Sequence, residues 1–182
     1  WKETVAKLND DFLNLTGDCV VSAGTISYLG SFTTEFREML VKEWRDSLKE
    51  AGLAHTEGCD IEQTLTEPVK LRSWQLAGLP TDSLSTQNGL VMDRGRRWPL
   101  CIDPQGQANR FIKTYGKDKT VCENGTEVIK LSDKNFLRSL ENGVRFGKWI
   151  LLENILEELD ASLEPILLQQ KFKQGGQEMM RI

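Results

Sequence analysis

The segment from Asp103 to Arg110 has the position and spacing of a phosphate-binding turn, because it lies between a short apolar segment and a segment of helical composition. A working turn, GxxxxGK[ST], needs glycines whose neighbouring N–H groups surround phosphate, a lysine for the terminal phosphates and a hydroxyl for magnesium. The four defining positions are occupied here by Asp103, Ala108, Asn109 and Arg110. Pro104 and Gly106 keep the composition of a turn.

Each replacement removes one component of nucleotide binding. Asp103 places a carboxylate beside the expected polyphosphate, and Ala108 adds a Cβ where a glycine is needed. Asn109 removes the cation, while Arg110 removes the hydroxyl and offers a charge of different reach. The segment also fits an ordinary Pro/Gly turn, so a retained turn with a lost site is one of two open interpretations at this point.

A second altered element follows the apolar segment Ile150–Leu152. Hydrolytic nucleotide sites of this kind end a buried strand with Asp-Glu, in which Asp holds magnesium through water and Glu polarises the attacking water. Here the pair is Glu153-Asn154, and an Asn cannot act as a base. The two altered elements together favour a degenerate nucleotide-binding module without catalytic residues.

The elements that position these residues alternate between strand and helix after Trp98. Such alternation predicts an α/β fold with parallel strands and crossover helices. The expected strands are Pro99–Ile102, Glu127–Leu131 and Trp149–Leu152, and the expected helices are Ala108–Tyr115, Asp133–Arg145 and Ala161–Gln169. Asp133 is a candidate N-cap, and Met179 to Ile182 is expected to be a strand.

The segment before Trp98 is predicted to be helical. Trp1, Val5, Leu8, Phe12 and Leu15 have the a/d spacing of a coiled coil, although an amphipathic helix on a globular core shows the same pattern. Gly17 and Asp18 are expected to break and recap the chain before a buried helix at 19–29. Further predictions are a helix that follows Thr33 and Thr34 and ends at about Ala51, a loop at 54–67, a helix opened by Pro68, and a helix to about Val91 capped by Asp82.

Composition excludes several classes of function. The net charge of −4 gives no field that would hold nucleic acid or an anionic membrane. No apolar run approaches the roughly 20 residues of a membrane span, and no signal peptide is recognisable, so an intracellular protein is expected. The four cysteines are scattered, which predicts reduced structural thiols, and His55 with Cys59 lacks the second pair that a metal site needs.

Four long segments closely resemble dynein heavy chains of the axonemal type, and together the resemblance covers nearly all of the chain. They are LTGDCVVSAGTISYLGSFT, PVKLRSWQLAGLPTDSLSTQNGL, RRWPLCIDPQGQANRFIK and LSDKNFLRSLENGVRFGKWILLENILEELDASLEPILLQQ. The resemblance implies part of a six-module AAA+ ring that hydrolyses ATP elsewhere and moves on microtubules through a coiled-coil stalk. The resemblance further implies two domains. Residues 1–61 would form the stalk base and the lid helices of the fourth module, and residues 62–182 would form a partial large subdomain of the fifth module.

In this family the fifth module does not hydrolyse nucleotide, so the resemblance implies a structural role without a cofactor in this segment, while ATP and magnesium act in other modules. The implied partners are neighbouring modules, the linker, the microtubule, and intermediate and light chains, in the cytoplasm and axonemal cytoskeleton of cilia or flagella. The implied sheet order places a later strand between the strands at Leu100 and Ile150, so an incomplete sheet is expected. A regulatory module that binds ADP or ATP without hydrolysis, and a free-standing helical adaptor, remain alternatives.

Overall fold

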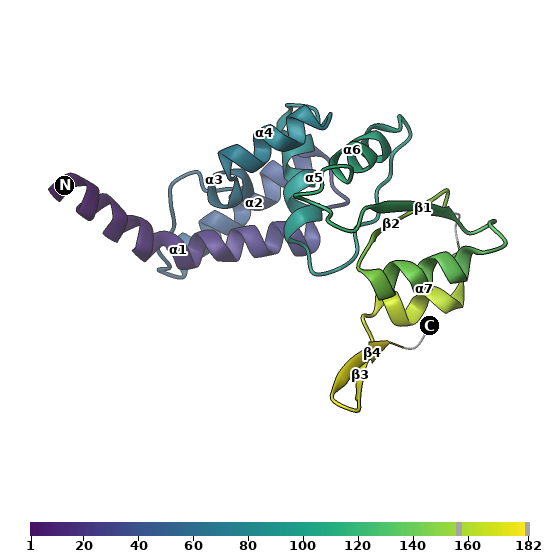
Figure 1. The fold of residues 1–182 in the computed structure, drawn as a ribbon. Coiled ribbons are helices and arrows are strands. Elements are labelled where there is room, and N and C mark those ends of the chain that lie inside the picture. The colour runs from purple at the N-terminus through teal and green to yellow at the C-terminus, as the bar shows by residue number, and fades with distance from the viewer. Residues whose placement is uncertain (156–157, 181–182) are drawn as a thin grey trace. The chain divides into compact units, whose positions relative to one another are not determined.

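The computed structural model describes residues 1–155 and 158–180, and the chain divides into two compact units, Trp1–Leu100 and Cys101–Ile182. The first unit is helical and the second mixes helices with strands (Figure 1). This division follows contacts within each unit, whereas the boundary between modules at 61/62 stays a prediction.

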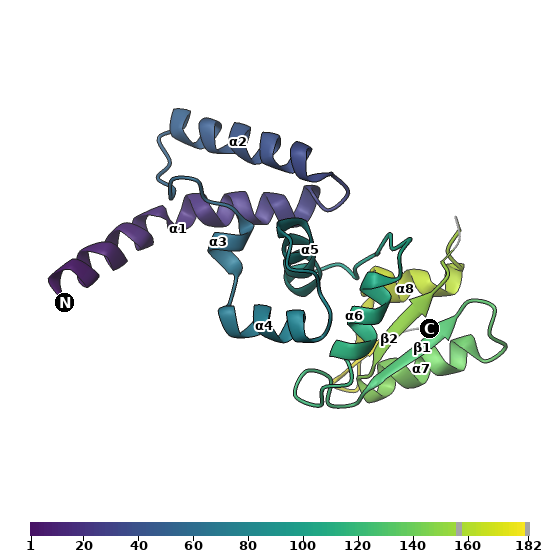
Figure 2. The same ribbon diagram turned by 90° about the horizontal axis from the view of Figure 1, so that it is seen from above.

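The helices of the first unit are α1 (Lys2–Tyr28), α2 (Thr34–Glu50), α3 (Ile61–Leu65), α4 (Pro68–Leu76) and α5 (Ser83–Arg94). Helices α1 and α2 lie side by side (Figure 2). Their shared core is apolar and consists of Val21, Leu29, Val41, Leu48 and Cys59, with Leu40 and Trp44 packed against it. A Cβ at Gly24 would lie 2.7 Å from the Trp44 ring, so this glycine lets the ring pack directly on α1.

The expected break at Gly17 and Asp18 is wrong, because α1 continues through both residues. Gly17 is buried, and a Cβ there would lie 2.4 Å from the carbonyl oxygen of Ala54. The carboxylate of Asp18 accepts hydrogen bonds from the backbone N–H and the hydroxyl of Thr56, at 2.8 and 2.7 Å. These two residues therefore hold a distant loop against the helix instead of ending it.

Other helix boundaries follow their local signals. Pro68 lies in the first turn of α4, and the Asp82 carboxylate accepts the N–H of Ser85 at 2.9 Å, which confirms the predicted cap of α5. The helix extends to Arg94, three residues beyond the expected end. The expected loop at 54–67 contains the short α3, which is capped by Asp60. Its five residues are too few for the helical period to show in the sequence.

The second unit contains α6 (Gln107–Tyr115), β1 (Thr126–Lys130), α7 (Phe136–Phe146), β2 (Trp149–Glu153), the 3-10 turn η1 (Ala161–Leu163), α8 (Glu164–Leu167), β3 (Lys171–Gln174) and β4 (Gln177–Met180). Strands β1 and β2 pair in parallel, with Thr126 opposite Trp149 and Lys130 opposite Glu153. Helix α7 connects them, so the predicted parallel strands with a crossover helix are confirmed.

The two faces of β2 have different neighbours, because alternate side chains of a strand point to opposite faces. Ile150 packs against the core made by Ile129, Phe136, Leu140 and Leu163, and a Cβ at Gly143 of α7 would lie 2.2 Å from it. On the opposite face, Trp149 contacts the Tyr115 ring of α6, with centroids 6.0 Å apart. The two helices thus hold β2 from opposite sides (Figure 2).

The expected strand at 99–102 is absent, and the Leu100 and Ile102 side chains are exposed. A strand needs a partner for its backbone hydrogen bonds, and among the described residues β1 and β2 pair only with each other. This observation agrees with the expectation of an incomplete sheet.

Three further expectations in the second unit need correction. Helix α7 begins at Phe136, because the Asp133 carboxylate accepts the N–H of Lys130 and does not cap the helix. The helix expected at 161–169 is the shorter η1 and α8, which contain Pro165 and end at Leu167. Strands β3 and β4 form an unpredicted antiparallel hairpin around Gly175 and Gly176, both with positive φ. Of the expected terminal strand, 179–180 belong to β4, and Arg181 and Ile182 lie outside the described residues.

Candidate nucleotide-binding turn

The turn at 103–106 leads directly into α6, and its shape depends on Gly106. Gly106 is the N-cap of α6 with φ of +69°, a left-handed conformation that glycine adopts without steric cost. The Asp103 carboxylate accepts the backbone N–H of Gln107 at 2.8 Å and that of Asn109 at 2.9 Å. A side chain of the turn itself therefore occupies N–H groups in the first turn of α6.

These N–H groups are the kind of donor that binds phosphate at a helix N-terminus. An incoming phosphate would have to displace the Asp103 carboxylate or approach it against like-charge repulsion. Of the other predicted positions, Ala108 is half-buried, whereas Pro104 and Arg110 are exposed. The Asp103 carboxylate thus lies where an anion would bind at the N-terminus of α6.

Glu153 lies at the end of β2 and is held by two side chains of α6. The Asn109 amide donates to Glu153 Oε1 at 2.6 Å, and the Lys113 ammonium lies 2.5 Å from the same oxygen. The hydrogen bond from Lys113, followed by that from Asn109, lowers the pKa of the Glu153 carboxyl below its usual value. Glu153 is therefore held as a carboxylate by α6. One of its two partners, Asn109, stands at the position where a working phosphate-binding turn has its lysine.

Asn109 of the altered turn and Glu153 of the altered pair are in direct contact through this hydrogen bond. Asn154 follows β2, is exposed and has φ of +55°, a conformation that Asn tolerates better than most residues. Lys113 is a residue of the site that was not predicted from the sequence. It stands four residues after Asn109 and so lies on the same face of α6, a spacing that could have revealed it.

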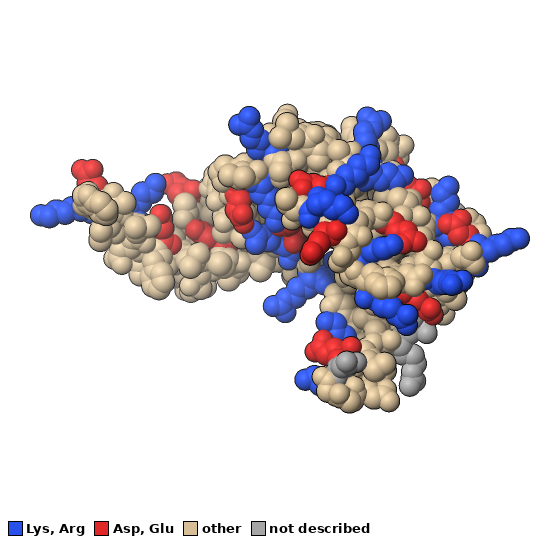
Figure 3. Space-filling view, viewed as in Figure 1, with Lys and Arg blue, Asp and Glu red and all other residues tan. Residues whose placement is uncertain are grey.

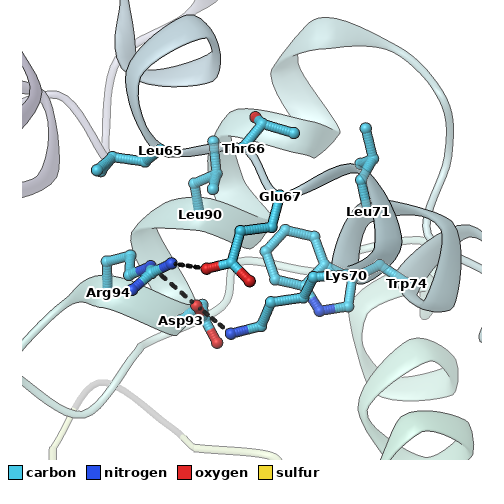
Figure 4. Close-up of a pocket in the computed structure, with 9 residues that line it drawn as sticks. All are labelled: Leu65, Thr66, Glu67, Lys70, Leu71, Trp74, Leu90, Asp93 and Arg94. Atoms are coloured by element: carbon cyan, nitrogen blue, oxygen red, sulfur yellow. Dashed lines mark hydrogen bonds and ion pairs between the residues drawn. The ribbon is translucent and has the colours of Figure 1, made fainter. Parts of the chain in front are cut away.

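A separate pocket lies in the first unit, between α4 and α5 (Figure 4). Its charged side chains pair with one another: Lys70 with Asp93 at 2.7 Å, and Arg94 with Glu67 at 2.5 Å and Asp93 at 3.3 Å. The Lys70 ammonium also lies 5.8 Å from the Trp74 ring centroid. The cations are thus engaged within the pocket, and the cluster is best explained as packing between two helices.

The described residues offer few other sites. All four cysteines are free, with Cys59 and Cys122 buried, and burial is the main cause that raises the pKa of the Cys59 thiol to about 11. No group of three or more His, Cys, Asp or Glu side chains in this part of the chain is arranged to hold a metal ion. None of the helices that the structure describes is long and apolar enough to cross a membrane. The face drawn in Figure 3 carries both basic and acidic side chains.

The parallel β1–α7–β2 unit, with a phosphate-loop-like turn opening α6, is typical of P-loop-type α/β folds. A profile described as "ATP-binding dynein motor region" matches residues 72–182. The chain belongs to this family of dynein motor regions.

Similar proteins include mouse "Dynein axonemal heavy chain 3", which is 47% identical over 182 residues, and human "Dynein axonemal heavy chain 1", which is 48% identical over 182 residues. The "Dynein-1-beta heavy chain, flagellar inner arm I1 complex" of Chlamydomonas reinhardtii is 39% identical over 184 residues. Each comparison covers 100% of this chain and 4% of the relative. The chain thus spans a small part of the length of these heavy chains.

Proposed function

We propose that this chain is a structural, non-hydrolytic AAA+ module, with adjoining lid and stalk-base helices, in the ring of an axonemal dynein motor driven by ATP. The observation that carries the proposal is the Asp103 carboxylate on the N–H groups of Gln107 and Asn109. A site whose anion-binding donors are occupied by its own side chain has no need of nucleotide to hold its shape.

The contacts of Glu153 support the same conclusion. A hydrolytic site would leave the first carboxylate of the pair free to hold magnesium through water, but Glu153, which stands at that position, is bound by Lys113 and Asn109. These bonds join α6 to β2 directly, a mechanical link that a ring module can use to pass movement between its neighbours. In this proposal ATP and magnesium act in other modules.

The proposed setting follows from the relatives, whose names describe axonemal and flagellar heavy chains. We place the protein in the cytoskeleton of the cilium or flagellum. Its partners would be the neighbouring AAA+ modules and linker of the same heavy chain, the microtubule through the distal stalk, and the intermediate and light chains of the complex.

The proposal is tested by titrating the full-length motor with fluorescent ATP and magnesium after the nucleotide sites of the other modules have been disabled by mutation. No saturable signal is expected. The matched control is the motor with those sites intact, which must bind the same nucleotide. Saturable binding that is lost when Gly106 or Asn109 is replaced by a bulky acidic residue would overturn the proposal.

The second candidate is a regulatory module that binds ADP or ATP without hydrolysis. It is favoured by the exposed Arg110 in the first turn of α6 and by the retained left-handed Gly106. In this case the Arg110→Ala variant would weaken nucleotide binding in the same titration. If the module is structural, the Arg110→Ala variant leaves the titration signal unchanged.

A further inference from the structure

The solvent side of α2 combines three exposed apolar side chains with several carboxylates. Phe32, in the turn before α2, is 42% exposed, Phe36 is 52% exposed and Met39 is 47% exposed. The Phe32 and Phe36 rings are in contact, with centroids 6.3 Å apart. Exposed single apolar residues are common, but a contiguous aromatic pair with a methionine one turn away is the composition of a binding surface.

Carboxylates accompany these apolar side chains, together with the exposed Lys42, which stands three residues from Met39. Glu35, Glu43 and Asp46 are exposed and stand four or seven residues from Met39, so they share its face of the helix. None of the three forms an ion pair with a described residue. We call the set the acidic-aromatic face, and it consists of Phe32, Glu35, Phe36, Met39, Glu43 and Asp46.

The acidic-aromatic face is held in place from within. The buried guanidinium of Arg37 donates to the backbone carbonyls of Gly30 and Phe32, at 3.1 and 3.0 Å, and thereby fixes the turn that carries Phe32. A surface whose shape is already fixed loses less conformational entropy when a partner binds.

The composition of the face indicates the chemistry of its partner. Apolar anchors spaced by one helical turn fit an amphipathic helix, and unpaired carboxylates around them favour lysine and arginine on that helix. The permanent cores of this chain are apolar, whereas this face is rich in charge, which is typical of a reversible contact.

We propose that the acidic-aromatic face reversibly docks a basic amphipathic helix from another part of the same polypeptide. Three apolar side chains with screened charges bind weakly between separate molecules. A partner in the same polypeptide benefits from a high effective concentration, and this chain spans only 4% of its relatives. The inference does not depend on the nucleotide turn.

The test places the photoreactive amino acid p-benzoylphenylalanine at position 39 of the full-length protein and identifies the crosslinked peptide by mass spectrometry. The control carries the same group at Val69, which is 85% exposed on α4 and lies outside the face. We expect a crosslink from position 39 to a segment outside 1–182 that bears lysine or arginine at helical spacing, and a lower yield from position 69.

A second measurement removes the charge complementarity. The variant E35K/E43K/D46K is expected to lower the crosslinking yield about tenfold, because each exposed ion pair contributes a fraction of a kcal/mol that adds over three positions. The matched control E57K/E123K/E141K changes the net charge equally at exposed residues that are not members of the face and is expected to leave the yield within about twofold. Circular dichroism verifies that both variants remain folded.

Several outcomes would overturn the proposal. A crosslink to a separate polypeptide, or to a segment without basic residues, would show a different occupant. A yield from position 39 no higher than that from position 69 would show an unoccupied face. Equal yields from the two triple variants would show that charge plays no part.

Discussion

Arg37 is a buried cation whose direct partners are all neutral. It is 3% exposed and donates to two backbone carbonyls, to Gln87 Oε1 at 3.2 Å and to Asn88 Oδ1 at 2.7 Å. Burial lowers the pKa of the guanidinium, yet hydrogen bonds to four acceptors offset the cost. We predict that Arg37→Met lowers the free energy of unfolding by about 3 kcal/mol, since it leaves buried acceptors without a donor. Urea denaturation measures this loss.

The control at this scale is Lys42→Met, an exposed position on the same helix, which is expected to change stability by no more than about 0.5 kcal/mol. Arg37→Lys should fall between the two, because one ammonium cannot replace a planar fork that bonds four acceptors. An Arg37→Met variant as stable as Lys42→Met would contradict the prediction.

At the scale of elements, Lys113 joins α6 to β2 through Glu153, and the join depends on pH. The pKa of Glu153 is lowered in the fold, so its stabilisation is present above the ordinary carboxyl pKa near 4.5 and is lost as pH falls through the folded value. We predict that Lys113→Met costs about 1 kcal/mol at pH 7, a modest value because the lysine is 39% exposed. The difference from the wild type should shrink at acid pH in urea denaturation.

The matched control is Lys117→Met, an exposed lysine just after α6. This variant should show no such pH-dependent difference. A loss in Lys113→Met that stays constant down to pH 3 would mean that the ion pair is not its cause.

Gly17 offers a second prediction at this scale. Gly→Ala inside a helix ordinarily stabilises by about 1 kcal/mol, but a Cβ at Gly17 would lie 2.4 Å from the Ala54 oxygen. We predict that Gly17→Ala destabilises by about 2 kcal/mol in thermal or urea unfolding, because the loop must move away. Cys19→Ala, at an exposed position of α1, is the control and should be nearly neutral. A gain in stability from Gly17→Ala would show that the loop yields easily.

At the scale of the whole molecule, exposed apolar side chains predict association of the 182-residue chain by itself. The stripe on α1 is exposed throughout and consists of Trp1, Val5, Leu8, Phe12 and Leu15. We predict that sedimentation velocity shows association that rises with concentration, and that the L8Q/F12Q variant reduces it. The control K7Q/D11Q changes exposed polar positions of the same helix and should have no effect. A monomer at all concentrations would contradict the prediction.

Much of the fold was predictable because its signals are local. The Asp82 cap, the proline at the start of α4 and the alternation that produces β1, α7 and β2 each depend on a few neighbouring residues. A glycine, by contrast, can either end a helix or allow close packing within one, and its local sequence does not distinguish the two roles. Gly17 was expected to end a helix, but it is required for close approach by Ala54, a residue far away in the sequence.

The candidate site divides in the same way. The sequence by itself determined the family, the altered residues of the turn and the strand that leads to the Glu153-Asn154 pair, because residue identity and spacing carry that information. Only the tertiary structure decided that Asp103 occupies the N–H groups of α6, that Lys113 and Asn109 hold Glu153, and that 99–102 forms no strand. Hydrogen-bond partners across a fold depend on which segments meet, and strand formation depends on a neighbouring strand, so neither is encoded by local composition.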